Sequence, residues 1–309
     1  MLPQEIFSQI PIEAIEFARN VFNQANDDVS RLLTIQPSMH EEGLDFALIG
    51  ALQKVGTRIL PNTRVAVQID AHWLGGRALY GRWEIADIAL IVMVRVDGRL
   101  FARKVALIQS KRLYSDEVSG EELREDDYKI GIGRLVDRTD AHSPLARSRA
   151  FSFTEVSKYR ELDSKSEQVQ RIDAYAIKRD IPVYYNLYNP VNLPIYLTFP
   201  WPADKALRRQ NKLGCRVMPR EEVHNVLRAV NGSPKFKELI GRVRRGNSPF
   251  ARHGWRLENF VADEILMCRE GRLFGAAEHV DLQAMLYERS APIASAVTIT
   301  FDLPASILG

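Results

Sequence analysis

The sequence predicts an α/β fold in which helices flank a mixed central sheet. Two near-continuous apolar runs, residues 83–94 and 105–114, are rich in Ile, Val and Leu, which is typical of strands covered on both faces. Asp97 and Gly98 lie between these runs, and Asp-Gly is a strong hairpin signal. The two strands are therefore expected to pair antiparallel.

The segments before and after these strands alternate between helical and extended patterns. Helices are expected where apolar residues recur every three to four positions, and strands where apolar residues alternate or run together. Pro11 is expected to open the main N-terminal helix, and Ser38 is expected to cap the next helix. In chain order the expected elements are one or two helices at 4–33, a helix at 39–52, strands at 64–73, 83–94 and 105–114, a helix at 154–178, strands at 183–188 and 215–218, helices at 220–230 and 257–268, and a strand at 296–301.

The composition is that of an ordinary globular protein and excludes several classes. Of 309 residues, 46% are hydrophobic and 26% are charged. No apolar run is long enough to cross a bilayer, and the start lacks a basic segment followed by an apolar core, so we expect a cytoplasmic protein without membrane contact. Cys215 and Cys268 stand alone, which argues against a disulfide framework or a structural zinc site. A Gly-x-x-x-x-Gly-Lys-Ser/Thr phosphate loop is absent, which argues against an NTP-driven motor.

Basic residues are unevenly distributed along the chain, although the net charge is only +3. Concentrated basic groups suit a phosphate backbone, so the second of two clusters in particular is expected to contact nucleic acid. The first cluster comprises Arg208, Arg209, Lys212, Arg216 and Arg220, and the second comprises Arg242, Arg244, Arg245, Arg252 and Arg256.

Polar side chains interrupt both apolar strands at the same end of the predicted hairpin. Asp87 enters the first strand far from the turn, and the second strand leaves at that end through Gln109, Ser110 and Lys111. Side chains alternate between faces, so Gln109 and Lys111 point the same way and Ser110 the other. A buried charge is costly unless it is paired or bound to metal. A structural ion pair between Asp87 and Lys111 is one explanation, and a functional site is the other.

These residues resemble the signature of the PD-(D/E)xK nuclease superfamily, in the variant where Gln replaces the second acidic residue. Asp87 matches the first element, and Gln109-Ser110-Lys111 matches the second. The resemblance covers residues 38–189 and implies a restriction-endonuclease-like αβββαβ core. On this basis we expect a nuclease-like domain over residues 1–230, with its core at about 38–190, N-terminal helices at 4–33 and a C-terminal accessory region at 231–309.

The resemblance also implies the members of a metal site. Asp87 would be a bridging carboxylate, Gln109 a neutral oxygen ligand, and Glu42 a further ligand from the helix before the first strand, with Glu41 as the alternative. The metal would be Mg²⁺ or Mn²⁺, since hard cations take oxygen ligands. Lys111 would orient or deprotonate the attacking water, or stabilise charge on the phosphate. A polar contact from Gln168 on the second core helix is a further expectation.

The function implied by the resemblance is metal-dependent hydrolysis of DNA by an endonuclease, in restriction or defence against phage. The alternative is a catalytically inactive nuclease-fold module that binds nucleic acid or protein. Gln109 in place of an acidic residue keeps that alternative open. A homodimer would suit cutting of both strands, and an activating partner protein is a further expectation.

Overall fold

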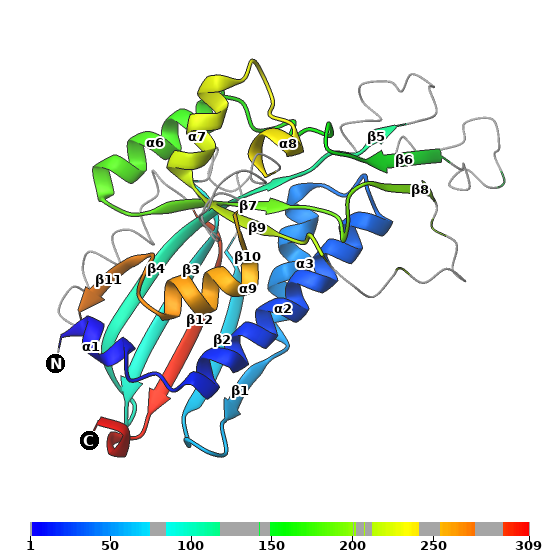
Figure 1. The fold of residues 1–309 in the computed structure, drawn as a ribbon. Helices are drawn as coiled ribbons and strands as arrows, with labels where there is room; N and C mark the ends of the chain where they lie inside the picture. The colour runs from blue at the N-terminus through cyan, green and yellow to red at the C-terminus, as the bar shows by residue number, and fades with distance from the viewer. Residues whose placement is uncertain are drawn as a thin grey trace, which may run out of the picture.

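The computed structural model describes residues 2–74, 85–117, 142, 149–199, 201, 207, 212–240, 254–275 and 293–308. It is a mixed α/β structure whose central sheet is flanked by helices, as expected (Figure 1). The helices are α1 (Pro3–Phe7), α2 (Ile12–Ile35), α3 (Glu41–Gln53), α6 (Glu167–Arg179), α7 (Arg220–Ala229), α8 (Phe236–Leu239), α9 (Leu257–Asn259), a π-helix (Phe260–Leu266) and a 3-10 helix (Ala305–Leu308). In these described ranges, every helix is too short or too polar to cross a membrane.

The strands form two sheets. The larger sheet has the order β1-β2-β12-β3-β4-β7-β9-β10, with β11 also paired to β4, and the smaller has the order β5-β6-β8. The pairs β12/β3 and β4/β7 are parallel and the others are antiparallel, so the central sheet is mixed. The strands are β1 (Gly56–Ile59), β2 (Ala66–Trp73), β3 (Ala86–Val96), β4 (Arg99–Arg112), β5 (Asp116–Glu117), β6 (Arg149–Phe153), β7 (Val183–Tyr188), β8 (Ile195–Phe199), β9 (Arg216–Pro219), β10 (Trp255–Arg256), β11 (Arg272–Gly275) and β12 (Ile293–Leu303).

The expected hairpin is present and carries the polar site at its open end. Strands β3 and β4 pair antiparallel, with Ile88 opposite Ile108. Asp97 and Gly98 have φ angles of 46° and 77°, and two positive φ angles are what a type I′ hairpin turn requires. The turn, together with a register shift between Val94 and Arg95, sets the register that brings Asp87 level with the end of β4.

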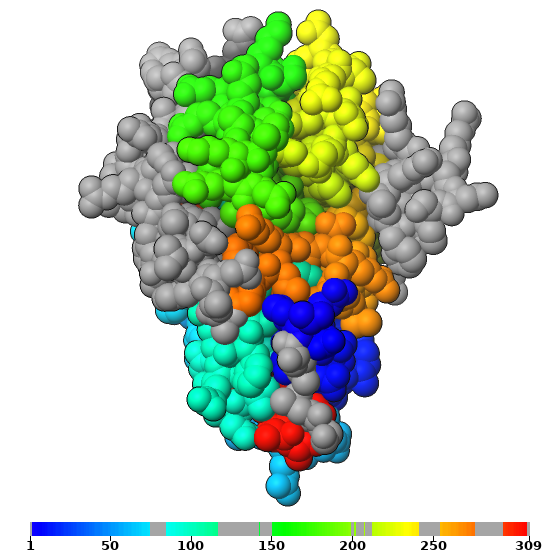
Figure 2. Space-filling model, turned by 90° about the vertical axis from the view of Figure 1, so that its left-hand side faces the viewer, coloured from blue at the N-terminus to red at the C-terminus, as the bar shows by residue number. Residues whose placement is uncertain are grey.

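Helices cover both faces of β7, next to this open end. Tyr188 donates a hydrogen bond to Asp45 of α3, whereas Tyr185 contacts His224 of α7. Positions of opposite parity on a strand face opposite sides, so α3 and α7 lie on opposite faces of the sheet. Figures 1 and 2 both show α6 and α7 side by side at one end of the molecule, with the two chain termini toward the other end.

The C-terminal strand β12 lies between β2 and β3, in the middle of the large sheet. The sequence placed this segment in an accessory region and expected β2, β3 and β4 to follow one another in the core. In the structure, β12 pairs with β2 on one side and with β3 on the other. Val297, Ile299 and Phe301 are buried, so the strand has the apolar character that a central position demands.

Two predicted helix boundaries are wrong. Helix α6 begins at Glu167, not at residue 154, because the preceding backbone bonds to another segment: the carbonyl of Ser157 accepts a hydrogen bond from Phe236 N at 2.8 Å. Helix α3 begins at Glu41 with His40 as its N-cap, and no side chain caps it, so Ser38 does not cap it. The start of α3 is held instead by tertiary contacts, described below.

Candidate functional site

The open end of the hairpin brings Asp87 against the end of β4. Asp87 Oδ2 accepts hydrogen bonds from Gln109 Nε2 and, at 2.6 Å, from the backbone N–H of Ser110. Gln109 is only 1% exposed, and Asp87 is half-buried. The first and second elements of the predicted motif are therefore in direct contact.

The first residue of α3 reaches the same strand end. Lys111 Nζ lies 2.9 Å from Glu41 Oε2, and the backbone N–H of Arg112 donates to Glu41 Oε1 at 3.1 Å. Glu42, the first choice from the sequence, is exposed. Consecutive helical residues differ by about 100° in direction, so only one of the two acids can face β4, and that one is Glu41.

The sequence did not single out Asp45, which lies one turn after Glu41 on α3. Asp45 Oδ1 accepts hydrogen bonds of 2.6 Å from Ser110 Oγ and from Tyr188 OH, and the carboxyl group is buried. Ser110 therefore points to α3, away from the Gln109 side of the strand. The spacing of four between Glu41 and Asp45 is the signal that could have identified Asp45, because such residues share a helix face.

Arg112 holds the segment that precedes α3. Its Nη1 donates to the carbonyl of Pro37 at 2.9 Å and to that of Met39, and its guanidinium lies 3.8 Å from the centre of the Tyr114 ring. Tyr114 OH in turn donates to Glu161. These contacts position the start of α3, so that Glu41 meets Lys111.

Carboxyl groups dominate the electrostatics of this cluster. Burial raises the pKa of Asp87 well above its usual range, and the nearby Asp45 carboxyl adds to the rise. Burial also raises the pKa of Asp45, to about 7, although the hydrogen bonds from Ser110 and Tyr188 oppose it. Burial alone would lower the pKa of Lys111, but Glu41 and Asp87 raise it above its usual value, so Lys111 stays charged at neutral pH.

The donor set offers oxygen atoms to a hard cation. Gln109 Oε1 is buried and has no hydrogen-bond partner among the described residues, and Asp87 supplies a carboxylate beside this amide. Glu41, paired with Lys111, supplies a second carboxylate at the same strand end. Three carboxyl groups interact electrostatically around one ammonium group, and a cation would relieve their repulsion. Within the described part of the chain, no group of three or more His, Cys, Asp and Glu side chains is arranged to hold a metal. A bound metal would therefore need the Gln109 oxygen and water as additional ligands.

Among the basic-cluster residues that the structure describes, three arginines are engaged in contacts within the protein. Arg216 bonds to the Leu213 carbonyl, Arg220 pairs with Asp173, and Arg256 pairs with Glu258. Gln168, expected to approach the site, is buried in the first turn of α6. Outside the described residues lie Arg208, Arg209, Arg242, Arg244, Arg245 and Arg252.

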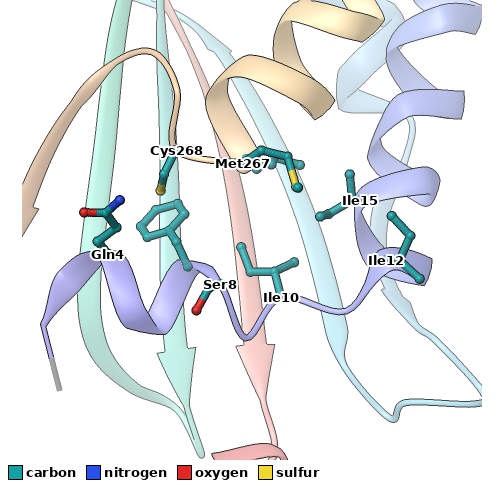
Figure 3. Close-up of a pocket in the computed structure, with 9 residues that line it drawn as sticks. Gln4, Ser8, Ile10, Ile12, Ile15, Met267 and Cys268 are labelled. Atoms are coloured by element: carbon teal, nitrogen blue, oxygen red, sulfur yellow. The ribbon is translucent and has the colours of Figure 1, made fainter.

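A cavity of about 280 Å³ lies apart from this cluster, between α1 and the turn after the π-helix (Figure 3). Its lining includes Phe7, Ile10 and Cys268 and is mainly apolar. Lys104 lies near it, with its ammonium 5.8 Å from the centre of the Phe7 ring, and is seven residues before Lys111 on β4. At about 3.3 Å per residue, the backbone of Lys104 is roughly 20 Å from the strand end.

Comparison with known proteins adds no assignment: no family model, curated protein or solved structure matches this chain. The interpretation of the site therefore depends on its geometry and on the resemblance of its short motif.

Proposed function

We propose that this chain is a metal-dependent endonuclease that hydrolyses phosphodiester bonds of DNA, with its active site at the open end of the β3–β4 hairpin. The observation that carries the proposal is a pair of contacts at one strand end, Asp87 with Gln109 and Lys111 with Glu41, linked by the electrostatic attraction between Lys111 and Asp87. A purely structural ion pair needs only one acid for one lysine. Several buried acids around one lysine are unusual in such a role, because each additional carboxyl group costs free energy when it is desolvated.

Asp87, Gln109 and Glu41 are the residues that would hold Mg²⁺ or Mn²⁺. The metal would neutralise the phosphate and lower the pKa of the attacking water. Asp87 is pre-oriented by Gln109 and by the Ser110 backbone, which hold one carboxylate oxygen and leave the other for a ligand.

Lys111 is assigned an electrostatic role in this proposal. Its raised pKa keeps the ammonium protonated, so it is a poor base for water. A fixed positive charge in a buried site stabilises negative charge that develops on a phosphate. Lys111 would therefore orient the phosphate and the water, with Glu41 holding the ammonium in place.

Cleavage of plasmid, linear duplex and single-stranded DNA tests the proposal, with Mg²⁺, Mn²⁺ or EDTA, beside Asp87→Ala and Lys111→Ala. We expect metal-dependent cutting by the wild type and none above background in either variant. Cutting that survives both substitutions would refute the site. Salt-sensitive DNA binding without cutting, under all metal conditions, would instead favour the inactive binding module.

A further inference from the structure

An aromatic pair lies on the outer flank of α3, at the same end of the sheet as the candidate site and on the sheet face that α3 covers. The rings of Phe46 and Trp73 are stacked, with centroids 4.1 Å apart and planes at 28°. Phe46 is nevertheless 50% exposed, and Leu74, the next residue after Trp73, is 48% exposed. A large part of the Phe46 ring is thus held open to solvent, with Trp73 supporting it from one side.

Strand pairing places this pair at the same end of the sheet as Asp87. Trp73 lies opposite Ser295 of β12, and Ser295 lies opposite Ile88 of β3. Ser295 Oγ also donates to the Asp87 carbonyl at 2.6 Å. Two strand spacings of about 4.8 Å separate β2 from β3, so the backbone of Trp73 lies roughly 10 Å from that of Ile88.

Helix α3 carries Asp45 on the side that faces the sheet and Phe46 on its exposed side. Phe46 follows Asp45 directly, and it lies one turn after Glu42 on the exposed flank of α3. The carboxylate of Glu42 disfavours a phosphate at this flank, because like charges repel. The group that a polynucleotide can offer to an aromatic ring here is the face of a base, and base–aromatic stacking does not depend on the sign of the charge.

We propose that Phe46, supported by Trp73, stacks against an unpaired nucleobase close to the phosphate that is cut, an inference that rests on the proposed function. In an intact duplex both faces of each internal base are covered by neighbouring bases. Stacking on Phe46 therefore requires a single strand, a frayed end or a base turned out of the helix. The substrate class assigned by this geometry is single-stranded or locally unpaired DNA.

Binding of a fluorescein-labelled oligothymidylate, and of a duplex of equal length, tests the inference by anisotropy. The measurements are made in EDTA and with Ca²⁺ in place of Mg²⁺, so that binding is read without relying on cleavage. Phe46→Ala removes the ring and Phe46→Tyr keeps it, while thermal melting reports folding. Phe101→Ala is the matched control, because Phe101 is an exposed aromatic residue at the hairpin end of β4.

We expect Phe46→Ala to weaken single-strand binding by roughly 5- to 150-fold, the usual contribution of one stacked base. Phe46→Tyr and Phe101→Ala should bind like the wild type, and duplex binding should not change in any variant. Wild-type affinity in a folded Phe46→Ala protein would overturn the inference, as would a wild type that binds no single strand. If Asp87→Ala and Lys111→Ala abolish cleavage while Phe46→Ala changes nothing, this inference fails and the proposed function stands. Single-strand binding that depends on the Phe46 ring, together with no cleavage by the wild type, would support this inference and refute the proposed function.

Discussion

Two buried lysines on the same strand have opposite electrostatic surroundings. Lys104 is 2% exposed and Lys111 is 3% exposed. Lys104 donates to the carbonyl of Ile265 at 3.0 Å, and burial lowers its pKa, whereas the carboxylates around Lys111 raise that of Lys111. Burial is therefore common to both lysines, and the concentration of acids is what distinguishes the strand end from the middle of β4.

The largest expected contrast is between substitutions of these two lysines. Lys111→Met should lower the rate of metal-dependent cleavage by about 10²- to 10³-fold, because it removes a fixed charge next to the phosphate. Lys104→Met should leave the rate within about threefold of the wild type, since Lys104 lies far from the strand end. Single-turnover cleavage of a labelled oligonucleotide measures both. Equal losses in the two variants would mean that burial, and not the acid cluster, decides the effect.

Part of the pH dependence of stability should trace to Asp45, beside Asp87 and Glu41, whose pKa values burial also raises. Its pKa rises from 3.8 to about 7 on folding, so the folded state binds the extra proton between these values. Stability is therefore lost as pH rises from about 4 to about 7, by on the order of 4 kcal/mol for this group. Asp45→Asn should remove that loss and stabilise the protein at pH 8, as measured by urea unfolding at several pH values.

Asp263 is the control of opposite sign. The hydrogen bonds from Arg19 lower the pKa of Asp263, so its contribution to stability is present at neutral pH and is lost as pH falls. Asp263→Asn should therefore flatten the acid side of the profile. If the unfolding free energy of Asp45→Asn changes with pH between about 4 and 7 as it does in the wild type, Asp45 is ionised throughout this pH range in the folded protein.

Two buried arginines of β4, Arg103 and Arg112, are expected to differ in the same way as the two lysines. Arg112→Met should cost about 3 kcal/mol of unfolding free energy, because the carbonyls of Pro37 and Met39 lose their donor. It should also lower the cleavage rate, since Glu41 is no longer held against Lys111. Arg103→Met, on the same strand, should cost about 1 kcal/mol and spare the rate. If Arg112→Met keeps full activity, the start of α3 is positioned by other contacts.

The smallest changes are expected for two asparagines, Asn186 in β7 and Asn189 directly after this strand. Asn186 is fully buried beside Ser110, and neither polar atom of its side-chain amide has a hydrogen-bond partner among the described residues. The side chain of Asn189, in contrast, makes three hydrogen bonds, with Tyr159 OH and with the carbonyls of Leu187 and Gly214. Asn186→Leu should stabilise the fold by about 1 kcal/mol, and Asn189→Leu should destabilise it by about 2 kcal/mol. Thermal unfolding compares them. A loss of stability in Asn186→Leu would indicate that a ligand or water satisfies this amide.

The hairpin, and the meeting of Asp87 with the end of the second strand, could be predicted because their signals are local. Asp-Gly fixes the turn, and alternation along each strand fixes the face of each side chain. The register shift between Val94 and Arg95, which moves the strand pairing by one residue, was not predicted. The position of β12 could not be predicted in this way, because its partners lie about 200 residues earlier and an apolar strand fits several places in a sheet.

The choice between Glu41 and Glu42 also depended on tertiary contacts. Both acids suit the first turn of a helix, and only the hold of Arg112 on the preceding backbone decides which one faces β4. Arg112 carried no signal of its own, since a lone arginine after a motif is usually a solvated surface group. Buried side chain–backbone contacts of this kind are visible only once the chain is folded.

Binding of Mn²⁺ shows whether the acid cluster at the strand end holds a cation, on which the proposed nuclease function depends. Electron paramagnetic resonance of free Mn²⁺ can be compared for the wild type, Asp87→Asn and Lys104→Met. We expect one bound Mn²⁺ per chain in the wild type and in Lys104→Met, and weak or no binding in Asp87→Asn. A wild type that binds no Mn²⁺, or an Asp87→Asn variant that binds it equally well, would show that the cluster is not a metal site.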